Sequence, residues 1–491
     1  MEKKSYIVAI DVGSSEVKVA VGTLADNDTI NVECIATEPC EGISAGVINN
    51  IQTVGKALRT ARDRAEQMAG VAITDAYVSI SSKAVRCARY TDHVFVEDAE
   101  NCISQRDVMS LSERMHNVKA ADGEIIMDLF PICYKNDMGM EMKVPVGSFS
   151  KQLTATYNFI LCEERQVRDR FMNLFRDAGI RVKGMFASGT VIAESVVTAE
   201  EKEEGVAIVD IGSGITDVAI YHGGALCYMV SIPIGGDAID SDIRHYASQI
   251  PLAAIEKLKR KYGSAKANMT SNVTINIQKG SRPLPSIQSF NLAAIIEARM
   301  TDIAEYVWNE IREAGFAKKL HAGIVLTGGV ANLQHISELF QQVTGLETRV
   351  ACAELGVTSD SFERVTSPSL TLAVSLLLRG AQEGATPVGI LQNVAKAEVK
   401  EAANEVKRAE EPKTPPTTIN DRYKSQEEAD EEEKQNNDNK TTTQREEEDI
   451  PDEPVPVRKG LFGRLADRLK TSFDKAFQNP DDDEEDDNDD Y

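Results

Sequence analysis

Two short segments of the chain place an aspartate directly before a turn rich in glycine and serine. They are residues 11–15, with the sequence DVGSS, and residues 210–214, with the sequence DIGSG. Glycine lets the backbone approach a ligand closely, and successive backbone N–H groups in such a turn form a concavity that binds anions. Both turns are therefore candidate phosphate-binding loops. The residues expected to contact phosphate are Gly13, Ser14, Ser15, Gly212, Ser213 and Gly214.

Carboxylates and a lysine extend these two loops. Asp11 and Asp210 precede the turns and suit a hydrated Mg²⁺, because Mg²⁺ keeps several waters and needs few carboxylates. Lys18 follows the first turn within reach of a phosphate, and Thr216 follows the second and is assigned to the same site. One such turn alone is weak support for a ligand site. Two copies in one chain favour the binding of a nucleotide.

Three further elements are candidates for the rest of a nucleotide site. A glycine pair after the apolar run 323–327 would let a flat base or a ribose approach the backbone, although it also fits an ordinary packing turn. A glutamate and a lysine three residues apart in the helical stretch 252–262 share a helix face that could bind ribose hydroxyls, although they also fit a surface ion pair. Another glycine pair, after 232–234, could cover phosphates. The glycine pair after 323–327 is Gly328 and Gly329, the helical stretch carries Glu256 and Lys259, and the pair after 232–234 is Gly235 and Gly236.

Short apolar runs flank both phosphate-binding candidates. Residues 6–10 precede the first turn and alternating valines follow it, and residues 206–209 and 215–220 flank the second turn in the same way. This pattern predicts a β-hairpin with an aspartate at its mouth. Because the copies lie about 200 residues apart, the sequence predicts two related halves. Alternating strand-like and helix-like runs predict an α/β fold.

The negative charge of the chain is concentrated towards its C-terminal end. The 491 residues carry a formal net charge of −24, and residues 411–491 hold 26 acidic and 12 basic side chains. An acidic chain is a poor match for a phosphodiester backbone, so no nucleic acid is expected as a partner.

No apolar run approaches the roughly 18–20 residues of a membrane span. Residues 395–409 could form a charged helix, and residues 411–453 contain only four apolar residues in 43, so the range 391–457 is predicted to be a disordered linker.

The segment 458–478 differs from the linker before it. On a helical wheel its apolar side chains gather on one face and its basic side chains on the other, as in helices that attach to a membrane surface. The expected anchor residues are Leu461, Phe462, Leu465, Leu469, Phe473, Phe477, Arg464 and Arg468. An anionic membrane surface is the expected partner, and docking on the body of the protein or on another protein is the alternative. The acidic tip, 479–491, would be repelled by such lipid, and its role stays open.

The order of these motifs is similar to that in the actin, sugar-kinase and Hsp70 ATPase superfamily, and within it to the bacterial cell-division protein family FtsA. The matching stretches are residues 7–22, 42–82, 205–236, 253–263, 323–332 and 368–379. The resemblance implies an actin/Hsp70-like α/β fold, in which two lobes hold ATP and Mg²⁺ between them. It also implies an inserted α+β subdomain, with the linker and the amphipathic helix after the second lobe.

The resemblance further implies a division into subdomains. The expected ranges are 1–83 and 164–203 for subdomain 1A, 84–163 for the insert 1C, 204–228 and 310–390 for 2A, 229–309 for 2B, 391–457 for the linker, 458–478 for the membrane-targeting helix and 479–491 for the acidic tip.

The implied function is that of an ATP-binding scaffold in cell division. Such a protein tethers FtsZ filaments of the Z ring to the cytoplasmic face of the inner membrane at the septum, as a peripheral membrane protein. It also self-associates into filaments and helps to recruit later division proteins. FtsZ would dock on residues 229–309, with the helix at 292–311 as its platform. Residues 183–189 lack the acid or amide found at this place in hydrolysing relatives, so weak or absent ATPase activity is expected.

Three other classes of protein share parts of this pattern. A type IV pilus assembly scaffold of the PilM kind would have the same insert but no tethered amphipathic tail. A sugar kinase would need a sugar pocket and a general-base aspartate, and no residues mark these. A chaperone of the Hsp70 kind would need a β-rich peptide-binding domain, for which the acidic linker leaves no room.

Overall fold

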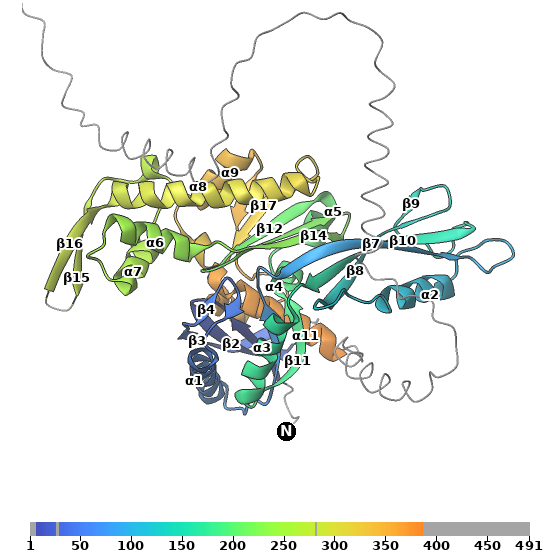
Figure 1. Cartoon of the computed structure of the whole chain (residues 1–491), viewed down its shortest axis with the longest axis horizontal. Coiled ribbons are helices and arrows are strands. Elements are labelled where there is room, and N and C mark those ends of the chain that lie inside the picture. Colours follow the sequence, from blue (N-terminus) through green and yellow to red (C-terminus); the bar gives the residue numbers. More distant parts are fainter. Residues whose placement is uncertain (1–5, 26–28, 280–281, 386–491) are drawn as a thin grey trace, which may run out of the picture.

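The computed structural model describes residues 6–25, 29–279 and 282–385, and these ranges form two lobes and an insert (Figure 1). The linker, the amphipathic segment 458–478 with its eight anchor residues, and the acidic tip lie outside the described residues. In the described part of the chain, no helix is both long enough and apolar enough to cross a lipid bilayer.

The first lobe is built on a five-stranded sheet with the order β11-β6-β1-β2-β3. β1 pairs antiparallel with β2 and parallel with β6, and β2 pairs antiparallel with β3. Residues Val8 and Ile10 of β1 face the helices α1 and α3, whereas Ala9 faces the opposite side. Both faces of β1 are therefore buried, which explains why it reads as a continuous apolar run. The bounds are β1 Tyr6–Val12, β2 Glu16–Leu24, β3 Ile30–Pro39, β6 Asp75–Ile80, β11 Arg181–Ala187, α1 Ile51–Ala69 and α3 Arg165–Asp177.

The second lobe repeats this sheet in the order β18-β17-β12-β13-β14. β12 pairs antiparallel with β13 and parallel with β17, as β1 does with β2 and β6. The helices α8 and α9 pack on one face of the sheet, where α1 and α3 pack in the first lobe. The prediction of two related halves is therefore confirmed. The bounds are β12 Val206–Ile211, β13 Thr216–His222, β14 Ala225–Ile232, β17 Ile324–Thr327, β18 Thr348–Val350, α8 Ser289–Glu313 and α9 Ile336–Thr344.

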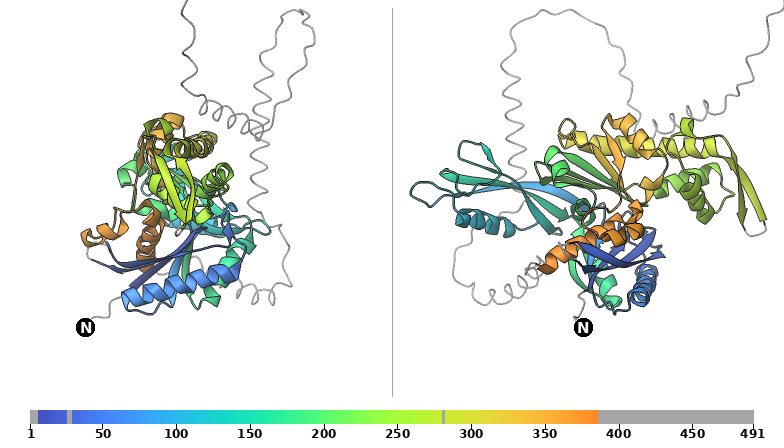
Figure 2. Two further views of the ribbon diagram at one scale, coloured as in Figure 1. Left: turned by 90° about the vertical axis from the view of Figure 1, so that its left-hand side faces the viewer. Right: turned by 180° about the vertical axis from the view of Figure 1, so that it is seen from behind.

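One apolar cluster joins the two sheets. It contains Ala9 of the first sheet, Ile208 of the second, Val191 of α4 and Leu376 of α11, all buried. Figure 2 shows α11 lying between the lobes. The helix α11 (Thr371–Ala385) therefore belongs to both lobes, although the predicted range 310–390 assigned it to the second. The other short elements are α4 Ser188–Val191, α5 Ala199–Glu204, α10 Phe362–Val365, β4 Ile43–Ser44 and β5 Val47–Ile48.

A small outer unit extends the second lobe beside the sheet. It begins within the second lobe after β14 and ends where α8 begins, and its apolar side chains join the same cluster as the sheet and α8. The expected range 229–309 begins inside β14 and ends inside α8, so neither element lies wholly within it. The helix predicted at 252–262 is confirmed as α7. The bounds are α6 Gly236–Tyr246, α7 Leu252–Tyr262, β15 Thr274–Lys279 and β16 Arg282–Gln288.

The insert leaves the first lobe but attaches to the sheet of the second. It has its own apolar core, yet β7 pairs with β14 at Arg86 and Val230, so that one nine-stranded sheet runs through both units. The buried Asn158 donates a hydrogen bond from Nδ2 to the carbonyl oxygen of Leu226 (3.3 Å). Figure 1 shows the insert and the α6–α7 unit at opposite ends of the second lobe. The insert consists of β7 Val85–Phe95, α2 Gln105–His116, β8 Ile125–Lys135, β9 Glu141–Met142 and β10 Gln152–Cys162.

Candidate functional site

The two glycine- and serine-rich turns have the same geometry and face each other. The N–H of Gly13 donates to the carbonyl oxygen of Glu16 (3.0 Å), and the N–H of Gly212 donates to that of Ile215 (2.9 Å). A Cβ placed on Gly214 would lie 2.7 Å from Ser14 Oγ, so the second loop closely approaches the first. A cavity of about 870 Å³ opens between the lobes beside these loops.

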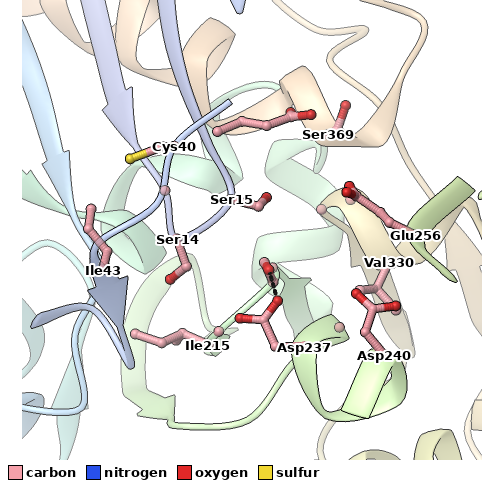
Figure 3. Close-up of a pocket in the computed structure, with 18 of the residues that line it drawn as sticks. Ser14, Ser15, Cys40, Ile43, Ile215, Asp237, Asp240, Glu256, Val330 and Ser369 are labelled. Atoms are coloured by element: carbon pink, nitrogen blue, oxygen red, sulfur yellow. Dashed lines mark hydrogen bonds between the residues drawn. The ribbon is translucent and has the colours of Figure 1, made fainter. Parts of the chain in front are cut away.

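The cavity gathers most of the residues that the sequence singled out. Figure 3 shows Ser14 and Ser15 on one side of it and Asp237, Asp240 and Glu256 on the other. The predicted residues that line it are Asp11, Gly13, Ser14, Ser15, Lys18, Asp210, Gly212, Ser213, Gly214, Gly236, Glu256, Lys259, Gly328 and Gly329.

Two predicted residues are not in the lining of the cavity. The side chain of Thr216 is fully buried, and its hydroxyl donates to the carbonyl oxygen of Ile234 (2.8 Å). Gly235 packs against the second loop so closely that a Cβ there would lie 2.5 Å from the carbonyl oxygen of Gly212. Both residues therefore support the second loop from behind.

The second loop is tied to the start of α6. The N–H of Gly236 donates to the carbonyl oxygen of Gly212 (3.0 Å), and the N–H of Asp237 donates to that of Ser213 (2.8 Å). The hydroxyl of Ser213 donates to the carboxylate of Asp237. These bonds hold the second loop in place with the protein's own groups, and such preorganisation lowers the entropy cost of binding a ligand.

Three carboxylates cluster at the bottom of the cavity. Burial raises the pKa of Asp210 to about 8, and the nearby charges of Asp217 and Asp11 act in the same direction. Burial, together with the charge of Asp11, raises the pKa of Asp217 to about 6, although a hydrogen bond from Ser231 opposes the shift. The Nζ of Lys18 lies 3.4 Å from Asp11 Oδ2 and is the basic group that counters this cluster.

This electrostatic setting fits a hydrated divalent cation. The lining residues include eight carboxyl groups and four basic side chains, and this preponderance of acidic groups would oppose an anionic ligand entering alone. A cation beside Asp11 and Asp210 would offset that repulsion and favour the ionised form of Asp210. Within the described residues, no three His, Cys, Asp or Glu side chains form a set that could hold a metal by themselves.

The third glycine element lies against the same carboxylates. Gly328 has a φ of 90°, and a Cβ there would lie 2.2 Å from Asp210 Oδ1. Only glycine combines this backbone conformation with this approach. Directly after this element the chain forms a 3₁₀ turn at Gly329–Asn332, and α9 begins at Ile336.

Glu256 and Lys259 share one face of α7, and both line the cavity. The Nζ of Lys259 donates to Asp240 Oδ2 (2.7 Å) and to the carbonyl oxygen of Gly236 (3.2 Å). Glu256 accepts a hydrogen bond from Arg260 (2.7 Å). The carboxylate of Glu256 thus lies at the mouth of the cavity, and the ammonium group of Lys259 lies beside α6.

Sequence reasoning missed several charged residues of the lining. Asp217 ends the DxGxGxxD motif that begins at Asp210, and this motif is its local signal. Asp237 directly follows the glycine pair at 235–236, which is a weaker signal. Glu16 directly follows the first turn, Glu41 lies in the loop after β3, and the remaining three lie on the helices α6 and α7, where a charged side chain by itself does not indicate a ligand site. The missed charged residues are Glu16, Glu41, Asp217, Asp237, Asp240, Arg244 and Arg260.

Comparisons with known proteins agree with this geometry. The family model described as "Cell division protein FtsA" matches residues 207–375. The cell division protein FtsA of Neisseria meningitidis serogroup B is 31% identical over 381 residues, which cover 77% of this chain and 90% of the relative. The protein of the same name from Escherichia coli K12 is 29% identical over 388 residues, which cover 77% and 91%.

A solved structure matches the fold. The chain in the structure of the PilM–PilN type IV pilus biogenesis complex has a TM-score of 0.54 and 13% sequence identity, and the match covers 77% of this chain and 99% of that one. At that identity the match concerns the fold alone. The two repeated sheets with a helical layer between them confirm the predicted actin-like fold. From its curated relatives and its fold, this chain belongs to the FtsA family of cell division proteins.

Proposed function

We propose that this protein is an ATP-binding scaffold of the division apparatus. The observation that carries the nucleotide part is the pair of equivalent turns, at Gly13 and Gly212, that face each other beside an acidic cavity between the lobes. Two rows of backbone donors on opposite walls suit a chain of phosphates. The acidic groups between them suit the Mg²⁺ that accompanies ATP.

Within this proposal, each part of the cavity has a separate task. The loops at 13–15 and 212–214 bind phosphates, and Lys18 neutralises part of their charge. Asp11 and Asp210 hold Mg²⁺ through water, and the bound ion supplies positive charge to the phosphates. Glu256, Lys259, Gly328 and Gly329 surround the nucleoside.

ATP acts mainly as a structural ligand in this scheme. A nucleotide that contacts both loops binds the closed arrangement of the lobes better than an open one, and it therefore shifts the population towards the closed form. No residue from 183 to 194 lines the cavity, so this segment brings no acid or amide to a water molecule there. We expect weak hydrolysis or none.

The remaining surfaces would hold the partners. FtsZ would dock on residues 229–309 of the second lobe, where the exposed residues of α8 include Glu305 and Tyr306. Self-association and contacts with later division proteins would use the insert, whose far end exposes large apolar side chains. These are Phe95, Met138, Met140, Val144 and Phe149. The segment 458–478 would attach the scaffold to the cytoplasmic face of the inner membrane at the septum.

Nucleotide binding can be tested by titrating the full chain with a fluorescent ATP analogue and Mg²⁺. The parent is expected to bind, and Asp210→Ala is expected to bind at least tenfold more weakly. Asp360→Ala is the matched control, because Asp360 is exposed and lies outside the cavity. Equal affinity of the parent and Asp210→Ala would show that the site is wrongly assigned.

Tethering can be tested by co-sedimentation of FtsZ filaments with liposomes. The full chain should bring FtsZ down with anionic liposomes, and a chain that ends at residue 457 should bind FtsZ without carrying it to lipid. Equal lipid binding by both chains would contradict the anchor. A full chain that binds lipid but not FtsZ would favour the PilM-like alternative, with which this chain shares the fold.

A further inference from the structure

An ion pair crosses the mouth of the cavity between the lobes. Arg260, in α7 of the second lobe, donates from Nη2 to Glu16 Oε1 (2.8 Å), and Glu16 begins β2 of the first lobe. The same Nη2 donates to Glu256 Oε1 (2.7 Å). All three side chains line the cavity. The side chains of Arg260 and Glu256 are 60% and 42% exposed, so the guanidinium group joins the two lobes on the solvent side of the cavity.

Glu16 belongs to the first phosphate-binding loop by its backbone. It directly follows Ser15, and its carbonyl oxygen closes the turn by accepting the N–H of Gly13 (3.0 Å). Its side chain is 21% exposed, and Glu16 Oε2 lies 4.0 Å from Lys18 Nζ. The carboxylate is thus held between a cation of its own lobe and a cation of the opposite lobe.

The neighbouring cations of α7 do not make this connection. Lys259 bonds to Asp240 within the second lobe. Lys261 lies over the ring of Tyr262, and Lys257 is exposed. Among the described residues of α7, Arg260 is the one cation that reaches the first lobe.

We propose that Glu16 is a positioning residue of the nucleotide site: it holds Arg260 across the cavity mouth, joins the two lobes there and slows the departure of a bound nucleotide. The proposal rests on the nucleotide binding proposed above. Opening the cavity separates α7 from β2, so it must break a charge-assisted hydrogen bond. The side chain of Arg260 is 60% exposed, which limits the strength of the pair.

A direct electrostatic effect of Glu16 would have the opposite sign. A carboxylate at the cavity mouth repels an anionic nucleotide, so its removal would by itself favour binding and retention. Positioning through Arg260 predicts faster release after the same change. The direction of the change in dissociation rate therefore separates the two roles.

The test measures release of a fluorescent ATP analogue from the full chain, with Mg²⁺, by stopped flow with excess unlabelled ATP. Glu16→Gln and Arg260→Gln should each raise the dissociation rate about two- to fivefold, the range expected for an exposed ion pair. The double variant should release no faster than Arg260→Gln alone.

Controls make the result specific. Lys257→Gln removes an exposed cation from the same helix and should leave the rate unchanged. The difference between the parent and Glu16→Gln should shrink at high salt, because exposed charges are screened. Thermal unfolding of each variant checks that the fold is retained.

Slower or unchanged release from Glu16→Gln would overturn the proposal, as would additive effects in the double variant. If the parent binds no nucleotide, the proposed function fails instead, so the two failures are distinguishable.

Discussion

Asp210 lies directly opposite Asp217 across the β12–β13 hairpin, at the position where Asp11 lies opposite Lys18 in the first hairpin. The first hairpin therefore pairs a carboxylate with a cation, and the second pairs two carboxylates. The symmetry between the two halves of the fold is broken at the place where a cation would bind. This difference underlies the first two predictions.

Replacing Asp210 should stabilise the protein in the absence of Mg²⁺, and more so at higher pH. Because burial raises the pKa of Asp210 from 3.8 to about 8, the native state holds a proton between these values that the unfolded state has released. Stability contributed by this group is present below pH 3.8 and is lost as the pH rises through about 8. The advantage of Asp210→Asn should grow by at most about 1.4 kcal/mol per pH unit in this window.

Thermal unfolding of both chains between pH 5 and pH 9 in EDTA measures this effect. The stability that Asp210→Asn gains over the parent should level off above pH 8, where the carboxyl group of Asp210 is ionised in the native parent. Asp360→Asn, an exposed change outside the cavity, should show no such trend. An advantage that is constant over the whole range would contradict the raised pKa.

Mg²⁺ alone should stabilise the parent at pH 8 and have little effect at pH 5.5. The ion competes with the protons held by Asp210 and Asp217, whose pKa values are raised to about 8 and about 6. A ligand that binds only the native state raises the melting temperature by mass action. Differential scanning fluorimetry with millimolar MgCl₂ checks this shift. Asp210→Asn should lose most of it, and an equal shift at both pH values would point to binding elsewhere.

Gly328→Ala should abolish nucleotide binding and destabilise the protein. The new Cβ would lie 2.2 Å from Asp210 Oδ1, in a backbone conformation with a φ of 90°. Gly315→Ala is the matched control, because Gly315 has a φ of 78° and nothing lies within 4 Å of its Cβ position. The control should lower the free energy of unfolding by about 1–2 kcal/mol, because of its backbone conformation alone. Gly328→Ala should lower it by more.

Chemical denaturation and nucleotide titration measure both effects. Normal nucleotide binding by Gly328→Ala would show that the glycine element lies away from the ligand.

Asn158→Ala should loosen the insert from the second lobe. The side chain is fully buried, and its loss would remove the hydrogen bond to the carbonyl oxygen of Leu226. Leaving a buried carbonyl without this donor costs about 1–3 kcal/mol. Thr156→Ala on the same strand is the control, since Thr156 bonds to Thr91 within the insert. Hydrogen exchange should quicken in β7 and β14 of Asn158→Ala but not of the control.

The sequence allowed those parts of the fold to be predicted that depend on local pattern. The two hairpins and the helix at 252–262 each have a periodicity and a turn composition that predict their structure without reference to the rest of the chain. The repeat of the hairpin motif also predicted the duplicated sheet, which the strand order confirms.

Features that depend on packing between distant segments were not predictable in this way. The pairing of β7 with β14 joins residues 144 positions apart, at Arg86 and Val230, and no local pattern marks an edge strand as the partner of another unit. The return of α11 to the first sheet is of the same kind. In the sequence, Arg260 is indistinguishable from the other cations of α7. Its bond between the lobes depends on Glu16, which approaches it from the first lobe.

The nine-stranded sheet has a mechanical consequence. Both chain connections of the insert come from the first lobe, whereas its strands continue the sheet of the second. The insert is therefore linked to the first lobe by the connections at 81–84 and 163–164 and to the second lobe by the sheet, so a rotation between the lobes would move the insert relative to at least one of them. A binding partner at the far end of the insert would sense whether the cleft is shut, without touching the ligand inside it.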